Sequence, residues 1–162
     1  MRRVLKLALA VATVAAVGAG TAEAQASGNI NAKATVLSAL SITGTDLDFA
    51  NVAPTQTKAI AAASGGTFTV TGSAGAPVLV SFALPATLGT NVNVGTWTGL
   101  FNTVNNAGTA VALTVSAAPQ ARTISGVVGV GNLFIWVGAT LTTVAATPGS
   151  YSAPVTLTVV YN

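Results

Sequence analysis

The sequence predicts an all-β protein built as a sandwich. Helical periodicity is nearly absent, and short alternating runs of Val, Thr, Ile, Leu and Phe recur along the chain. Clusters of Gly, Pro, Asn and Ser separate these runs, which is the pattern of sandwiches and barrels. Only 6% of the 162 residues are charged and 51% are hydrophobic. We therefore expect strands whose outer faces are wetted by Thr rather than by charged side chains.

The N-terminus predicts a secretory signal peptide. A basic start is followed by a short apolar run and by an Ala-x-Ala site that ends at Ala24. The apolar run is somewhat short for the roughly 20 residues of a membrane span, which is the alternative. Cleavage after Ala24 would export the mature chain to the periplasm, the cell surface or the extracellular medium. The expected parts are a signal peptide, an alternating N-terminal segment and a β-sandwich domain, at residues 1–24, 25–38 and 39–162.

The expected strands follow in order, each with its own boundary signal. Residues 30–36 alternate strictly, and residues 67–71 end at Gly72. Pro77 precedes residues 78–84, and the turn sequence Pro-Gly at 148–149 precedes a last strand within residues 151–161. The other expected strands lie at residues 40–43, 96–103, 110–115 and 133–144. Trp97 and Trp136 fall in two of them and are expected in the core, with sugar stacking as the alternative.

The charge left after cleavage is small. The formal charge of the whole chain is +3, but the mature part keeps Lys33, Lys58 and Arg122 against Asp46 and Asp48. A net charge of +1 supplies no basic patch for phosphate contacts, so we expect no nucleic-acid partner.

The residue types also limit the chemistry. The chain has no His and no Cys, which excludes a Ser-His-Asp triad, a Cys nucleophile, an imidazole or thiolate metal site and an internal disulfide. Asp46 and Asp48, at i and i+2, would share one face of a strand. They could form a turn, bind Ca²⁺ or act as an acid/base pair, and their role stays open. Lys33 or Lys58 could form a Ser-Lys dyad, but no spacing selects a nucleophile. We expect no enzyme, and no catalytic, cofactor-binding or metal-binding residues and no small-molecule substrate.

Several blocks together resemble a known family. They are LSI, DLDF, FTVTG, VGATL, PGSY and VTLTVVYN, at residues 40–42, 46–49, 68–72, 137–141, 148–151 and 155–162. In this order they resemble the bacterial secreted domain-of-unknown-function family 4402. That family is similar to the spore-coat-U-like subunits of archaic chaperone–usher pili. The chain departs from the pattern at Ala50, where the family usually has Gly, and it lacks the disulfides that are common in spore-coat-U-like subunits.

The resemblance implies an immunoglobulin-like sandwich with an incomplete sheet that a donor strand completes. In pilins a periplasmic chaperone supplies this strand first, and the N-terminal extension of the next subunit then replaces it. The candidate donor residues are Ile30, Ala32, Ala34 and Val36. The candidate chaperone-binding and acceptor strand has Val155, Leu157, Val159 and Tyr161 on one face. Alternatively, residues 30–36 form the first strand of a self-complete sandwich.

The resulting functional hypothesis is an exported, non-enzymatic structural or fimbrial-type cell-surface subunit that assembles by β-strand addition. Its partners would be copies of itself or related subunits, with a periplasmic chaperone and an usher during assembly. Two alternatives are a monomeric secreted binding or adhesion module and a small outer-membrane β-barrel. Exposed, nearly uncharged strand edges favour pairing with another chain, because few Lys or Glu residues oppose it.

Overall fold

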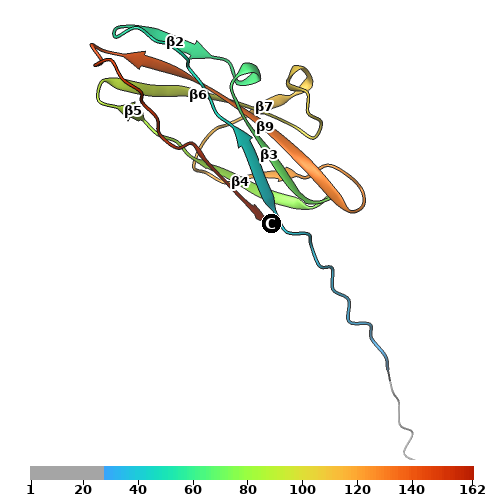
Figure 1. Cartoon of the computed structure of the whole chain (residues 1–162). Coiled ribbons are helices and arrows are strands. Elements are labelled where there is room, and N and C mark those ends of the chain that lie inside the picture. The colour runs from blue at the N-terminus through green and yellow to red at the C-terminus, as the bar shows by residue number, and fades with distance from the viewer. Residues whose placement is uncertain (1–27) are drawn as a thin grey trace, which may run out of the picture. The chain divides into compact units, whose positions relative to one another are not determined.

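The computed structural model describes residues 28–162 (Figure 1). Within this part the chain forms strands joined by loops and two short 3₁₀ helices, Ala62–Ser64 and Ala107–Thr109. The ten strands are β1 (Ser41–Thr45), β2 (Thr57–Ile60), β3 (Gly66–Ser73), β4 (Pro77–Ala83), β5 (Thr87–Gly89), β6 (Val92–Asn102), β7 (Val111–Leu113), β8 (Gln120–Thr123), β9 (Val130–Thr143) and β10 (Thr156–Tyr161).

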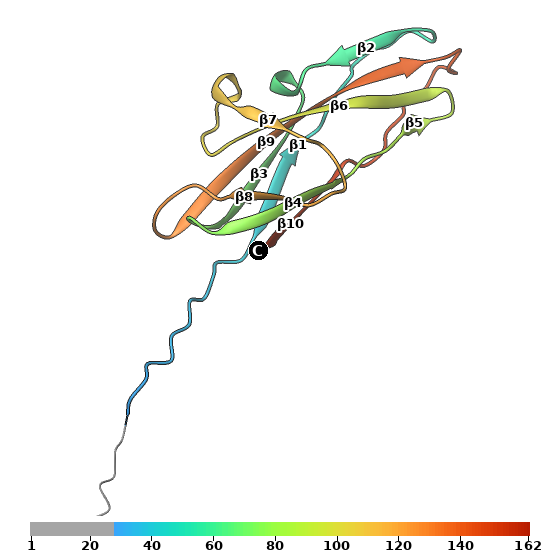
Figure 2. The ribbon, with the colours of Figure 1, turned by 180° about the vertical axis from the view of Figure 1, so that it is seen from behind.

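The strands form two antiparallel sheets that pack face to face without closing (Figures 1 and 2). The larger sheet has seven strands, with the order β1-β3-β9-β6-β5 and with β2 and β7 paired to β9 and β6. The smaller sheet has the order β10-β4-β8. This arrangement confirms the predicted all-β sandwich.

The core lies between the two sheets and follows from the alternation of the strands. Leu133, Ile135 and Val137 alternate along β9 and are at most 1% exposed. Val78 and Val80 of β4 face them from the smaller sheet and are fully buried. Burying a side chain of this size stabilises the fold by about 1.5–3 kcal/mol. A second cluster lies further along the larger sheet, and its buried members are Phe49, Val92, Val94, Ala139, Leu141 and Ala146.

The expected strands are partly confirmed. Strands lie within or around the expected residues 40–43, 67–71, 78–84, 96–103, 110–115 and 133–144. The last strand lies within the expected residues 151–161 and begins at Thr156, two residues after Pro154, which has no N–H to donate to a ladder. Three short strands, β2, β5 and β8, were not expected, since each has too few residues to show an alternation.

For residues 30–36 the sequence left two expectations, a donor strand or the first strand of the sandwich, and the structure differs from the second. Residues 28–40 belong to no strand, so residues 30–36 are not the first strand of the described sandwich. The expected signal peptide at residues 1–24 lies outside the described residues, and so do residues 25–27. Among the described residues, no helix has the length and apolar character needed to cross a membrane.

Candidate strand-acceptor groove

Two strands at one side of the sandwich have a neighbour on one side only. Within residues 28–162, β1 pairs with β3 and β10 pairs with β4, and neither has a second partner. The start of β1 lies near the end of β10, because Ser38 contacts Tyr161 there. The segments that follow β1 and precede β10 line one pocket at the other end. The two edge strands therefore run in opposite directions along the same side of the molecule.

The side chains that point inward from these edge strands are poorly covered. Ile42 of β1 pairs with Val70 of β3, so both point to the same face of the sheet. Val70 is fully buried, yet Ile42 is 39% exposed. On β10, Val159 pairs with the fully buried Val80 but is itself only half-buried. The core is thus left open between β1 and β10, where nothing in the described chain covers it.

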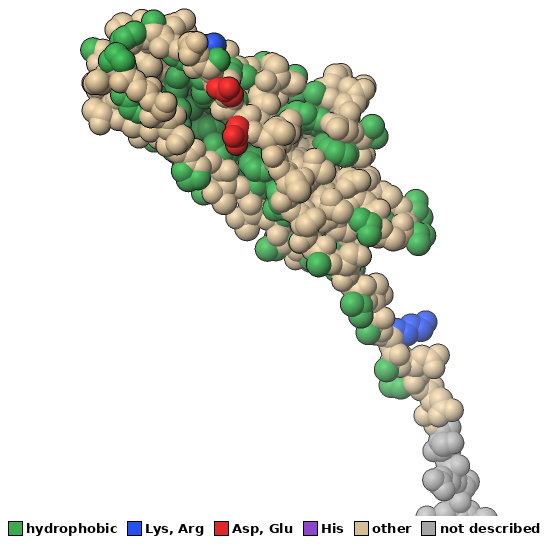
Figure 3. Space-filling view, viewed as in Figure 1, with side chains coloured by type: hydrophobic (Ala, Val, Ile, Leu, Met, Phe, Trp, Pro, Cys, Tyr) green, Lys and Arg blue, Asp and Glu red, His purple; other side chains and the backbone are tan. Residues whose placement is uncertain are grey.

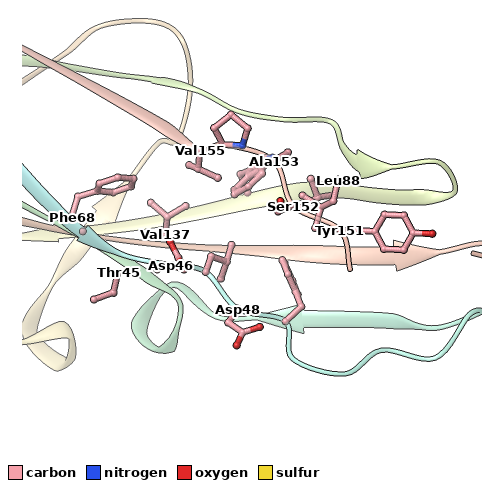
Figure 4. Close-up of a pocket in the computed structure, with 17 residues that line it drawn as sticks. Thr45, Asp46, Asp48, Phe68, Leu88, Val137, Tyr151, Ser152, Ala153 and Val155 are labelled. Carbon is pink, nitrogen blue, oxygen red and sulfur yellow. The ribbon is translucent and has the colours of Figure 1, made fainter. Parts of the chain in front are cut away.

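This opening deepens into a groove with a volume of about 580 Å³ (Figure 3). One wall consists of residues 44–49, which are the last two residues of β1 and the four that follow it. The opposite wall consists of residues 151–155, directly before β10. Phe68, Trp97 and Val137 lie at its floor and belong to or pack against the two core clusters. Figure 4 shows Phe68, Val137 and Val155 toward one end of the groove and Leu88 and Tyr151 toward the other.

The groove continues along the second core cluster. A second hollow of about 490 Å³ is lined by residues 47–54 on one side and 146–151 on the other. The two hollows share Leu47, Phe49, Leu88 and Tyr151, so they form one continuous groove. We call the two hollows together the groove.

Local features of the 151–155 wall leave it outside the strand ladders and fix Tyr151. Pro154 cannot donate a ladder hydrogen bond, and the Tyr151 hydroxyl donates to the Thr147 carbonyl at 2.6 Å. The Tyr151 ring packs directly over Gly89, where a Cβ atom would overlap the ring. The glycine therefore permits the close approach of Tyr151 to β5, at the place where the two hollows meet.

At the end of β10 that lies away from the groove, three hydrogen bonds surround Tyr161, and we call them the Tyr161 clamp. The Tyr161 hydroxyl accepts from the Ser73 N–H and donates to the Ser38 carbonyl, both at 2.7 Å. The Ser38 N–H donates to the Ser73 Oγ at 2.6 Å. Gly72 leaves room for this hydroxyl, since a Cβ there would lie 2.7 Å from it. The clamp joins the last strand of the smaller sheet to β3 and to the segment before β1.

The opposite side of the sandwich is closed by a side chain. The guanidinium of Arg122, on β8 of the smaller sheet, lies 4.3 Å from the centre of the Phe101 ring on β6 of the larger sheet. A cation over an aromatic face is attracted by the ring and covers it. The two sides of the sandwich therefore differ, and the open one lies between β1 and β10.

Asp46 and Asp48 lie at the rim of the groove rather than on a strand. The expectation that they share one strand face is wrong, because β1 ends at Thr45. Both side chains are exposed and lie beside the apolar hollow (Figure 3). The Asp48 Oδ1 accepts from the Ala50 N–H at 2.6 Å, which is a local turn interaction. Figure 4 shows the Asp48 carboxylate directed away from the apolar lining.

Among the described residues, no three His, Cys, Asp or Glu side chains lie close enough together to hold a metal ion. The groove is lined largely by aliphatic and aromatic side chains, which suit an apolar segment of a chain. The groove therefore presents mainly apolar side chains, with two carboxylates at its rim.

The structure brings some of the predicted site residues together. Val155 lines the groove, Leu157 is buried in the core, and Val159 and Tyr161 pack against it from β10. The candidate donor residues Ile30, Ala32, Ala34 and Val36 are exposed, with Ile30 and Val36 at 97% and 94%. Of the two tryptophans, Trp136 is buried at 5% exposure, whereas Trp97 is half-buried in the groove.

Sequence reasoning missed the groove floor and the clamp. Phe68 and Val137 were recognised only as strand residues, and Ser38 and Ser73 carried no signal in the sequence. Their positions depend on contacts across 35 or more residues, such as the 123 residues between Ser38 and Tyr161. The penultimate Tyr161 was the one part of the clamp that the sequence singled out.

Comparisons with known proteins assign no function to this groove. No protein-family model, curated protein or solved structure matches the chain. The groove and the alternating N-terminal residues are therefore the two features of the chain from which we infer its function.

Proposed function

We propose that the chain is an exported structural subunit of the fimbrial type that assembles by β-strand addition. In this proposal, residues 30–36 of one subunit, which we call the N-terminal run, enter the groove of the next. Ile30, Ala32, Ala34 and Val36 point into the groove, and the backbone of the run pairs with β1, β10 or both.

One observation carries the proposal: the core is open between two edge strands in a chain whose alternating N-terminal run belongs to no strand. Seven residues in extended conformation span roughly 20 Å, a length typical of one strand. Burying Ile30 and Val36 would each contribute about 1.5–3 kcal/mol. An inserted strand would also satisfy the unpaired backbone groups of β1 and β10.

The groove of the same chain is a poor acceptor for the run. Ser38, only two residues after Val36, is held by the Tyr161 clamp, at the end of β10 that lies away from the groove. Residues 36–40 read Val-Leu-Ser-Ala-Leu, and the single residue there of a type that tight turns favour is Ser38, whose backbone N–H and carbonyl are both bonded in the clamp. A return of the run along its own β1 would need a reversal at these residues and would disrupt the clamp. This favours a second copy as the acceptor.

The proposal is tested with the mature chain, residues 25–162, purified without a chaperone. We expect ladders of SDS-resistant oligomers on unheated gels and polymers in size-exclusion chromatography. The substitution Val36→Asp should abolish them, because a carboxylate would have to enter an apolar groove; the expected loss of affinity is at least about 100-fold.

Val127→Asp is the matched control. Val127 is 94% exposed, as Val36 is, but it lies in the loop between β8 and β9. This variant should assemble like the wild type. A mature chain that stays monomeric and does not bind an added peptide of residues 28–38 would contradict the proposal and favour the monomeric binding module instead.

A further inference from the structure

The mature chain contains few charged residues, and three of them fall on the two partners of the proposed insertion. The chain's acidic residues are Glu23, Asp46 and Asp48, and only the two aspartates follow the expected signal peptide. Both line the rim of the groove. The N-terminal run contains a single charged residue, Lys33.

The alternation of the run determines where Lys33 would point. Successive side chains of a strand lie on opposite faces. When Ile30, Ala32, Ala34 and Val36 face the floor of the groove, Asn31, Lys33 and Thr35 face solvent at its rim. Lys33 lies at the centre of the run, so it stays near the middle of the rim in either strand direction.

We propose that the groove recognises the run of a second copy in the register that places the Lys33 ammonium beside the carboxylates of Asp46 and Asp48. This inference rests on the proposed function and adds what determines the register. The apolar side chains supply the binding energy, but they distinguish poorly between alternative registers of the inserted strand. Ala32 and Ala34 are identical side chains, and a slip by two residues keeps the same face of the strand inward. A charge opposite two carboxylates distinguishes these registers.

The geometry at the rim supports this role for Asp48. Its Oδ1 is fixed by the Ala50 N–H, so the carboxylate is already oriented before a partner arrives. The other lysine of the mature chain is Lys58 on β2, which is half-buried and shares one face of that strand with Ile60. Lys58 belongs to the acceptor itself and serves as an internal control for effects of charge alone.

The inference is tested by binding a fluorescent peptide of residues 28–38 to the full mature chain carrying Val36→Asp, whose own run is disabled as a donor. At low ionic strength, we expect Lys33→Ala in the peptide to weaken binding about two- to fivefold, the range of an exposed ion pair. Lys33→Arg should retain the affinity, and Lys33→Glu should bind more weakly than Lys33→Ala.

A double-mutant cycle identifies the partners. On a chain that also carries Asp46→Asn and Asp48→Asn, the wild-type and Lys33→Ala peptides should bind equally well. The Asn side chain at 48 can still accept from the Ala50 N–H, so the local turn is preserved. Lys58→Ala should leave the difference between the peptides intact, and 1 M salt should abolish it, because the Debye length falls to about 3 Å.

The outcomes separate this inference from the proposed function. When the wild-type peptide binds but Lys33→Ala binds equally well at low salt, the role of Lys33 is refuted and strand addition stands. A difference that persists on the double-Asn chain also refutes it. When no peptide binds at all, both the inference and the proposed function fail.

Discussion

Ala50 is a strained residue at the rim of the groove. Its φ is 49°, in the left-handed region that glycine tolerates and alanine does not favour. The Ala50 N–H donates to Asp48 Oδ1, which holds the backbone in this conformation. The backbone therefore keeps a glycine-like turn although the residue is alanine.

Ala50→Gly should stabilise the protein. The left-handed conformation costs an alanine roughly 1–2 kcal/mol, and the greater freedom of glycine in the unfolded chain offsets about 0.4–1 kcal/mol of the gain. We expect the free energy of unfolding to rise by about 0.5–1 kcal/mol in urea titrations. Ala112→Gly, in exposed β7, is the control and should lower it by a similar amount. Equal destabilisation by both would contradict the strain at Ala50.

At the scale of elements, the Tyr161 clamp joins β10 to β3 and to the segment before β1. Removing the hydroxyl leaves the Ser73 N–H and the Ser38 carbonyl without this partner in a half-buried site. Tyr161→Phe should therefore lower the free energy of unfolding by about 1–3 kcal/mol and speed amide exchange at Ser73.

Tyr151→Phe provides the matched comparison. Its hydroxyl donates to an exposed carbonyl, which water can satisfy in its place. We expect a change below about 0.5 kcal/mol for this variant. Similar losses in the two variants would show that the clamp contributes no more than a surface hydrogen bond.

The floor of the groove offers an optical test of strand insertion. Trp97, on β6, is half-buried and lines the groove, whereas Trp136 is buried away from it. Binding of the 28–38 peptide should exclude water from Trp97 and shift the tryptophan emission to shorter wavelength. Trp97→Phe should remove this shift and Trp136→Phe should retain it. A shift that survives Trp97→Phe would locate the peptide elsewhere.

At the scale of the whole molecule, the sequence predicts the sandwich well and its groove poorly. The β9 core residues Leu133, Ile135 and Val137 alternate over a long strand, and such a pattern has few other solutions. Short strands such as β8 (Gln120–Thr123) depend on a neighbour for their pairing, which a local pattern cannot show.

The groove has no local signature because its walls are about 100 residues apart in the sequence. Leu47 and Phe49 alternate with Asp48, as strand residues do, and residues 151–155 fall within the span expected to hold the last strand. In the structure β1 ends at Thr45, and residues 46–49 and 151–155 are irregular segments that flank an opening to the core. What the sequence did indicate was the apolar face of β10 and the alternation of residues 30–36, the two partners of the proposed insertion.

The position of the Tyr161 clamp has a consequence for the symmetry of an assembly. Ser38, where the N-terminal segment joins the sandwich, lies beside Tyr161 at one end of β10, whereas the groove begins at the other end of that strand. A subunit that donates from one end and accepts near the other makes a contact between two different surfaces. Such a heterologous contact does not close into a dimer. Successive subunits would add head to tail, and they would form an open fibre unless the rotation between neighbours closes a ring.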